Sequence, residues 1–124
     1  MVTADLRTFL QAKLNVLTES VYYGTAPSDA GFLYLVYTLE EVSCDEGLSL
    51  QELEVDVVDY GPSTAAAERM ADDLQRELDH LHAVTEAFQI SVYRERRQPV
   101  FEDDKLIVRR RLTFQVRLHE RSTT

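Results

Sequence analysis

Residues 105–118 read KLIVRRRLTFQVRL, and this stretch carries the clearest structural signal in the 124-residue chain. Six apolar side chains fall on even positions between Leu106 and Leu118, and basic or polar side chains fill most of the odd positions. This alternation is typical of a strand with one buried face. Arg110 is the exception, because it falls on the apolar face. A charged side chain at such a position needs a partner, a bulge or the edge of the core.

A partner strand for this stretch is predicted at residues 88–97, with residues 98–104 as the connection. Pairing Val92 with Arg110 keeps the apolar faces of the two strands on the same side. In that register the core-forming pairs lie in one half of the hairpin and the basic residues in the other. We therefore expect the hairpin to extend beyond the core as an arm.

A second hairpin is predicted in the first half of the chain. Residues 32–39 are apolar at all but one position, which indicates a strand covered on both faces, and residues 48–60 form the return strand after a turn. Pairing Leu39 with Leu53 gives this hairpin one core face. The other face then carries Phe32, Tyr34, Val36, Val58 and Tyr60 at one end, and Glu52, Glu54 and Asp56 at the other. A patch of this size is expected to be covered by a helix, another sheet or another subunit.

Two amphipathic helices complete the prediction. Apolar residues recur at helical spacing over residues 6–17, and a longer helix is predicted over residues 65–87. Residues 21–23 form a brief strand between the first helix and an irregular loop. The fold class is therefore α+β, with residues 1–124 as a single domain. We expect an antiparallel sheet of two hairpins with an N-terminal helix and a longer central helix packed on it.

Charge is distributed unevenly along the chain. The formal net charge is −9, residues 1–62 alone carry all of it, and residues 88–124 hold nine basic residues against five acidic ones. The acidic total argues against a duplex-binding protein, and the basic runs are interleaved with acids, so we expect no sequence-specific binding of nucleic acid. The acidic first half and the basic C-terminal segment could attract each other either between subunits, in head-to-tail self-association, or within one chain.

The residues that could carry catalysis or bind metal are not arranged for either role. His80 and His82 are about 200° apart around the axis of the predicted helix, so they cannot share an ion. Cys44 lies beside two acidic residues, which disfavour its thiolate. The sequence contains no phosphate-binding loop or nucleophile motif. We expect no enzymatic activity, no cofactor and no metal.

The single cysteine and the lack of an apolar run of about 20 residues also lead us to expect a reducing compartment and no membrane contact.

The predicted elements follow one another in the order helix, short strand, polar loop, hairpin, long helix, hairpin. Three local sequence patterns are found in addition to this order. Residues 21–41 read VYYGTAPSDAGFLYLVYTLEE, residues 55–78 read VDVVDYGPSTAAAERMADDLQREL, and the closing hairpin is rich in basic residues. In these features nearly the whole chain resembles the tail-terminator or tail-completion (head–tail joining) proteins of tailed bacteriophages.

The resemblance implies an α+β virion structural protein of the neck, found in the host cytoplasm during assembly. It implies a homo-oligomeric ring, usually a hexamer, that caps the tail tube, contacts the tail tube protein and joins it to a head-side connector or neck protein. DNA passes through such a ring, and no catalysis is implied.

Ring formation would explain the uncovered patch and the projecting arm. We expect arginines of the closing hairpin to meet carboxylates of the first hairpin in an adjacent subunit. The predicted subunit or partner interface comprises Phe32, Tyr34, Glu52, Glu54, Asp56, Tyr60, Arg94, Arg96, Val100, Phe101, Arg109, Arg110 and Arg111. Two alternatives remain open: a small cytoplasmic ligand-binding domain, with polar groups converging near Tyr22, Tyr23 and Asp29, and an adaptor that acts as a dimer.

Overall fold

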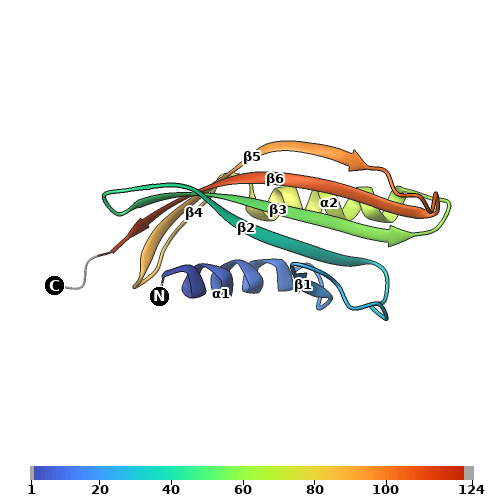
Figure 1. The fold of residues 1–124 in the computed structure, drawn as a ribbon, viewed down its shortest axis with the longest axis horizontal. Coiled ribbons are helices and arrows are strands. Elements are labelled where there is room, and N and C mark those ends of the chain that lie inside the picture. Colours follow the sequence, from blue (N-terminus) through green and yellow to red (C-terminus); the bar gives the residue numbers. More distant parts are fainter. Residues whose placement is uncertain (1, 122–124) are drawn as a thin grey trace.

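Two helices lie on one face of a curved six-stranded sheet in the computed structural model, which describes residues 2–121 (Figure 1). The elements in chain order are α1 (Val2–Asn15), β1 (Val21–Tyr23), β2 (Tyr34–Asp45), β3 (Leu48–Tyr60), α2 (Ala65–Leu78), β4 (Leu81–Val84), β5 (Phe88–Val100) and β6 (Ile107–Glu120). The strand order is β1-β2-β3-β6-β5-β4, with β1 parallel to β2 and the other neighbours antiparallel. The predicted α+β class is confirmed. The sheet is mixed, however, and is larger than the expected antiparallel pair of hairpins.

The first hairpin has the predicted register. Leu39 is paired with Leu53, and the turn contains Glu46 and Gly47, whose φ angles are 48° and 83°. Two successive residues with positive φ form the kind of tight turn whose twist matches that of the paired strands. The local turn and the alternation of apolar side chains therefore specify the same register.

The second hairpin has a different register from the predicted one. Val92 is paired with Val116 rather than with Arg110, β5 continues to Val100, and a bulge follows Arg94. Val92 therefore has an apolar cross-strand partner, whereas the predicted register set it opposite an arginine. Up to Arg94 the shift is six residues, an even number, so these parts of β5 and β6 keep their predicted faces. After the bulge the shift is seven residues, so Arg96 lies on the face opposite the one predicted, and so does Arg97.

Arg110 lies on the face of the sheet that the helices cover. Its Nε donates a hydrogen bond to Glu68 of α2, and Arg97 Nη1 donates to Asp72 Oδ1 at 2.7 Å. The side chains of Arg97 and Arg110 are only 21% and 22% exposed. The expectation of a projecting arm at this position is wrong, because carboxylates of α2 cover and pair with the arginines that suggested it.

The second helix is shorter than predicted. It ends at Leu78, and residues 81–84, which continue its apolar spacing, form β4 along the edge of β5. His80 has a φ of 62°, and the Asp79 carboxylate accepts the Arg94 N–H at 2.9 Å, so the chain turns here and docks on β5. Both helices have 14 residues, so the central helix is not the longer one.

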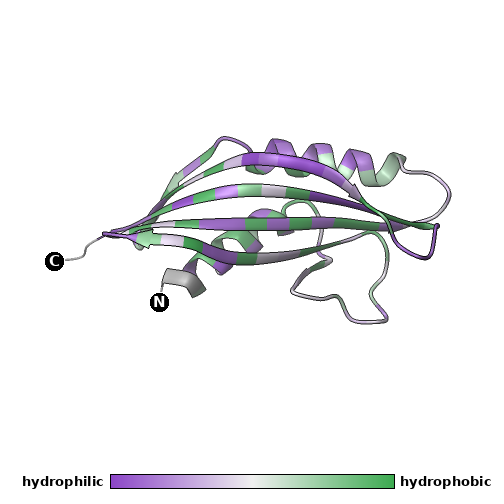
Figure 2. Cartoon of the chain, turned by 45° about the horizontal axis from the view of Figure 1, so that its top comes forward, coloured by the Kyte–Doolittle hydropathy of each residue, from purple (hydrophilic) through white to green (hydrophobic). Residues whose placement is uncertain are grey.

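One hydrophobic core lies between the sheet and both helices. Figure 2 shows the alternation of hydrophobic and hydrophilic residues along the long strands that places one apolar face against the helices. The fully buried core residues include Leu6, Leu10 and Leu14 of α1, Leu35, Leu53, Val55 and Val57 of the first hairpin, Ala67, Ala71, Leu74 and Leu78 of α2, and Val92, Leu112, Phe114 and Val116 of the second hairpin. Neither helix in residues 2–121 has the length and apolarity needed to cross a membrane.

The pairing of Arg110 with α2 can be tested by a double-mutant cycle with Glu68→Gln and Arg110→Gln. Because both side chains keep some contact with solvent, we expect a coupling energy of about 0.5–1 kcal/mol in the free energy of unfolding. Urea denaturation of the four proteins would measure it. Glu86→Gln, at an exposed site, is the control and should show no coupling to Arg110→Gln. Additive effects at Glu68 and Arg110 would show that the ion pair adds no stability.

Candidate functional site

The sheet face opposite the helices, which we call the open face, is not covered by any element of residues 2–121. Strand pairing places Asp56 beside Arg111, and Val58 beside Arg109. The open face collects most of the predicted interface residues: Tyr34, Glu52, Glu54, Asp56, Tyr60, Arg96, Val100, Arg109 and Arg111, with Phe32 packed on Tyr34. Three predicted residues lie elsewhere: Arg110 on the helix side, Arg94 opposite the core residue Phe114, and Phe101 in the β5–β6 turn.

The centre of the open face is a network of ion pairs around Asp56. This residue is 4% exposed, and its carboxylate accepts hydrogen bonds from Arg109 Nε at 2.7 Å and from Arg111 Nε at 2.8 Å. Arg111 also lies 3.0 Å from Glu54 Oε1. The hydrogen bond to Asp56 raises the pKa of Arg111 above its ordinary value, so its charge is permanent.

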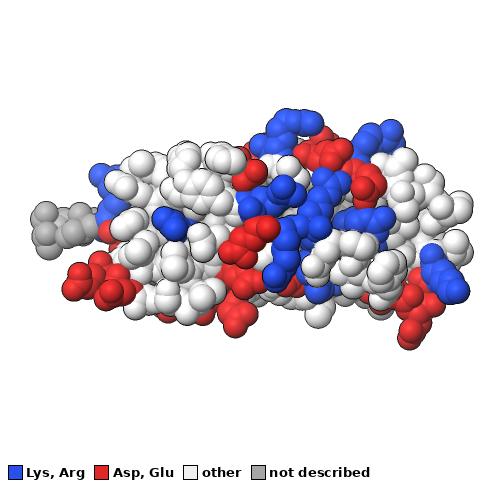
Figure 3. All heavy atoms as spheres, turned by 90° about the horizontal axis from the view of Figure 1, so that it is seen from above, with Lys and Arg blue, Asp and Glu red and all other residues white. Residues whose placement is uncertain are grey.

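The network extends to β5 and to the turn between β5 and β6. Arg109 Nη1 donates to Glu102 Oε1 at 3.2 Å, and Arg96 Nη2 lies 3.7 Å from Glu52 Oε1. We call Glu52, Glu54, Asp56, Arg96, Arg109 and Arg111 the arginine belt. In Figure 3, Lys and Arg atoms gather across the middle of the molecule with Asp and Glu atoms beside them. Thr113, which the register places between Glu54 and Arg96, is fully buried.

The belt forms within one subunit, whereas we expected these arginines to meet the carboxylates of a neighbour. The reason is the strand order: β3 and β6 are adjacent, so their side chains are direct cross-strand neighbours. Each belt arginine already has a carboxylate partner. The belt therefore offers phosphate groups little unpaired positive charge, and its arrangement is structural.

An aromatic patch adjoins the belt on the open face. The Phe32 ring lies 5.6 Å from the Tyr34 ring and 5.5 Å from the Tyr60 ring, and Tyr22 packs edge-on against Tyr34 at 5.8 Å. Phe32 is 50% exposed and Tyr60 is 48% exposed. Within residues 2–121 no helix or second sheet covers these rings. Of the three covers that the sequence allowed, another subunit is the one that the described residues leave open.

The β5–β6 turn, residues 101–106, is exposed but tied to the sheet. Phe101 is 90% exposed, and Glu102 is held by Arg109. The Asp104 carboxylate accepts the Leu106 N–H at 3.0 Å. The turn therefore presents an aromatic ring beside acidic side chains in a defined conformation.

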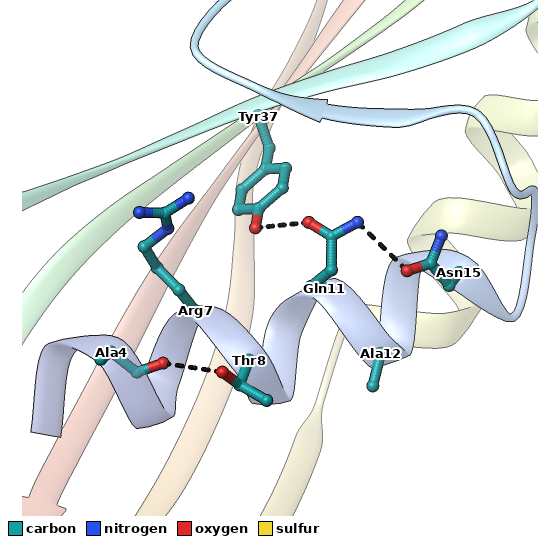
Figure 4. A pocket seen from close by; sticks show the side chains of 7 residues that line it. All are labelled: Ala4, Arg7, Thr8, Gln11, Ala12, Asn15 and Tyr37. Atoms are coloured by element: carbon teal, nitrogen blue, oxygen red, sulfur yellow. Dashed lines mark hydrogen bonds between the residues drawn. The ribbon is translucent and has the colours of Figure 1, made fainter.

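A groove of about 480 Å³ runs along α1 beneath Tyr37 (Figure 4). It is lined by Ala4, Arg7, Thr8, Gln11, Ala12, Asn15 and Tyr37, none of which is acidic. The Tyr37 hydroxyl donates to Gln11 Oε1 at 2.7 Å, and the Arg7 guanidinium carbon lies 3.7 Å from the centre of the Tyr23 ring. Burial raises the pKa of Tyr37, and Arg7 opposes this only in part. Our sequence reasoning missed this α1 groove, although Arg7, Gln11 and Asn15 recur at four-residue spacing on one helix face.

The polar groups proposed for a ligand site do not converge. Tyr22 packs against Tyr34 on the open face, whereas Tyr23 packs against Tyr37 on the helix side, with ring centres 5.1 Å apart. His82 lies in β4 and not in a helix, so the predicted angle of about 200° between His80 and His82 does not apply. The His80 and His82 rings instead contact Tyr93, with centres at 5.5 and 5.7 Å. Residues 2–121 contain no group of three or more His, Cys, Asp or Glu side chains placed to hold a metal ion.

Comparison with known proteins gives matches in fold only. No family model and no curated protein matches the chain. A chain of the "Virion of native gene transfer agent (GTA) particle" matches with a TM-score of 0.70 and 16% identity over 90% of each chain. A second solved chain, whose description gives no function, matches with a TM-score of 0.71 and 14% identity, covering 98% of this chain and 95% of the other. The α+β fold described above is therefore one that recurs in solved structures at low sequence identity.

The importance of Asp56 for the open face can be tested with Asp56→Asn. The substitution keeps the shape of the side chain but leaves Arg109 and Arg111 without their buried counter-charge. We expect the free energy of unfolding to fall by about 2 kcal/mol, less than for a fully buried pair because both arginines are partly exposed. Urea denaturation with Glu40→Gln, an exposed position on β2, as the control would measure the difference. An equal change in both variants would contradict a central role for Asp56.

The hydroxyl of Tyr37 can be tested through the pH dependence of stability. Tyr37→Phe should lower the free energy of unfolding by about 1 kcal/mol at neutral pH, because the partly buried hydrogen bond to Gln11 is lost. The folded-state pKa of Tyr37 lies above the ordinary value of 10.0, so its contribution is complete below pH 10 and is lost as the pH rises through the folded pKa. The difference between the native chain and Tyr37→Phe should therefore shrink above pH 10 in denaturation series. A difference that does not depend on pH would contradict this.

Proposed function

We propose that this protein is a virion structural protein that forms a ring, caps the tail tube of a tailed bacteriophage and joins it to the head connector. The observation that carries the proposal is the shared fold with a chain of the gene transfer agent virion, which extends over 90% of both chains. That match supports a role as a virion component. The more specific role, a ring that caps the tail tube, rests on the resemblance of the sequence to tail-terminator proteins in element order and local patterns. The two together favour an assembly role over other uses of an α+β domain.

The surface of the subunit supports an assembly role. The aromatic patch exposes about half of Phe32 and of Tyr60, and Phe101 is exposed almost completely. Grouped aromatic rings on a surface are typical of sites that contact other proteins. A ring of identical subunits needs two different contacting surfaces on each subunit. The aromatic patch, the β5–β6 turn and the α1 groove supply surfaces of different chemistry for that purpose.

The arginine belt suits a rigid subunit of a ring through which DNA passes. Its ion pairs link β3, β5 and β6 and so hold both hairpins in one arrangement. Since its arginines are already paired, the belt adds little attraction for passing phosphate groups. The proposed role requires neither catalysis nor a cofactor. The proposed partners are other copies of this chain, the tail tube protein and a head-side connector or neck protein.

The role can be tested by electron microscopy of particles assembled with and without this protein. We expect class averages of complete particles to show a ring at the head–tail junction, and we expect preparations without the protein to contain separate heads and tails. Adding back the native chain should restore joined particles. Joined particles with an unchanged junction in the absence of the protein would contradict the proposal. A particle in which the protein forms only a two-fold dimer would favour the adaptor alternative.

A further inference from the structure

We propose that the α1 groove of one subunit receives the β5–β6 turn of a second copy, so that subunits contact one another head to tail. The inference rests on the proposed ring and identifies one contact that would build it. The two surfaces differ in position as well as in chemistry. Figure 1 shows the β5–β6 turn at one end of the longest axis of the molecule, beyond the C-terminal end of α1.

The α1 groove is suited to an acidic ligand. The chain has 22 acidic residues and a net charge of −9, yet none of the groove residues is acidic. Among the ion pairs of residues 2–121, Arg7 has no carboxylate partner within 4.0 Å. The Arg7 guanidinium carbon lies 3.7 Å from the centre of the Tyr23 ring, and this contact keeps Arg7 at the groove. Figure 4 shows the Arg7 side chain beside Tyr37. An unpaired, positioned cation of this kind favours a carboxylate from outside the subunit.

The β5–β6 turn carries the matching groups. Phe101 is 90% exposed, and Asp103 follows it in the turn without a hydrogen bond or ion pair to another side chain of the described residues. Glu102 and Asp104 hold the turn in place through Arg109 and the Leu106 N–H. A segment that is already ordered loses little conformational entropy on binding. An exposed aromatic ring with a polar rim is also the usual form of an interface anchor.

Charge favours contact between the turn and the groove over contact between two copies of the turn. The carboxylate of Asp103 can pair with Arg7, and Phe101 can pack on Tyr23, which is 40% exposed beside the groove. Two acidic turns facing each other would repel. Because different surfaces meet, the contact is of the head-to-tail type, which closes into a ring when the rotation per subunit allows.

Charge reversal tests this contact. In sedimentation velocity at low salt, the variants Arg7→Glu and Asp103→Arg should each weaken self-association by about tenfold or more, because each sets like charges against each other. A chain with both substitutions should associate to within about threefold of the native chain, because the pair is restored in reverse. Arg69→Glu, an exposed cation on α2, is the control and should not change association. Single variants that associate normally, or a double variant that is not restored, would overturn the contact.

Disulfide trapping tests the same contact when subunits close into a ring only on their partners. In a Cys44→Ser chain, Ala12→Cys in the groove and Asp103→Cys in the turn should together give a ladder of multimers on a non-reducing gel of assembled particles. Either cysteine alone should give monomers. Monomers from the double-cysteine chain in particles that show a junction ring would overturn the contact and leave the proposed function intact. Particles without any such ring would contradict the proposed function itself. In that case the double-cysteine protein in concentrated solution would test the contact separately: a ladder of multimers would support it, and monomers would overturn it.

Discussion

The open face depends on one buried carboxylate. Asp56 is almost fully enclosed, and a buried charge of this kind is stable only when it is paired and hydrogen-bonded. Arg109 and Arg111 fulfil that requirement from β6, and Arg109 then reaches Glu102 in the β5–β6 turn. The pairing that neutralises Asp56 therefore also ties down the β5–β6 turn, which carries the exposed Phe101.

The three successive arginines of β6 are divided between the two faces of the sheet, and each has a partner there. Arg109 and Arg111 pair with β3 on the open face, while Arg110 pairs with Glu68 of α2 on the helix side. Ion pairs at the surface contribute little individually, but a network that shares partners across strands restricts how the sheet can deform. The charged side chains in the middle of the molecule therefore pair mainly within the subunit. The aromatic patch, the turn and the α1 groove are the surfaces that we propose for contacts with other subunits.

The sequence was enough to predict most of the residues of the candidate site, but not which of these residues contact one another. Strand parity alone assigned Tyr34, Glu54, Asp56 and Arg111 to one face, because neighbouring residues of a strand point to opposite sides. It could not show that the carboxylates and arginines belong to the same subunit, because that depends on β3 and β6 being neighbours. The α1 groove was also not predicted, since it requires Tyr37 of β2 to lie over the helix.

The sequence by itself determined the faces of β2, β3, β6 and the first part of β5, most of the hydrophobic core positions and the pairing of Leu39 with Leu53. These follow from side-chain alternation and a tight turn, both of which act over a few residues. Only the tertiary structure decided the register of β5 and β6, the end of α2 at Leu78 and the partner of Arg110. Each of these is set by long-range contacts. The turn between β5 and β6 is longer than a tight turn and β5 contains a bulge, so side-chain packing fixes the register of the two strands. The segment after α2 forms β4 because it can pair with the free edge of β5. Local periodicity could not distinguish that strand from the last turn of a helix, because its apolar residues fit both patterns.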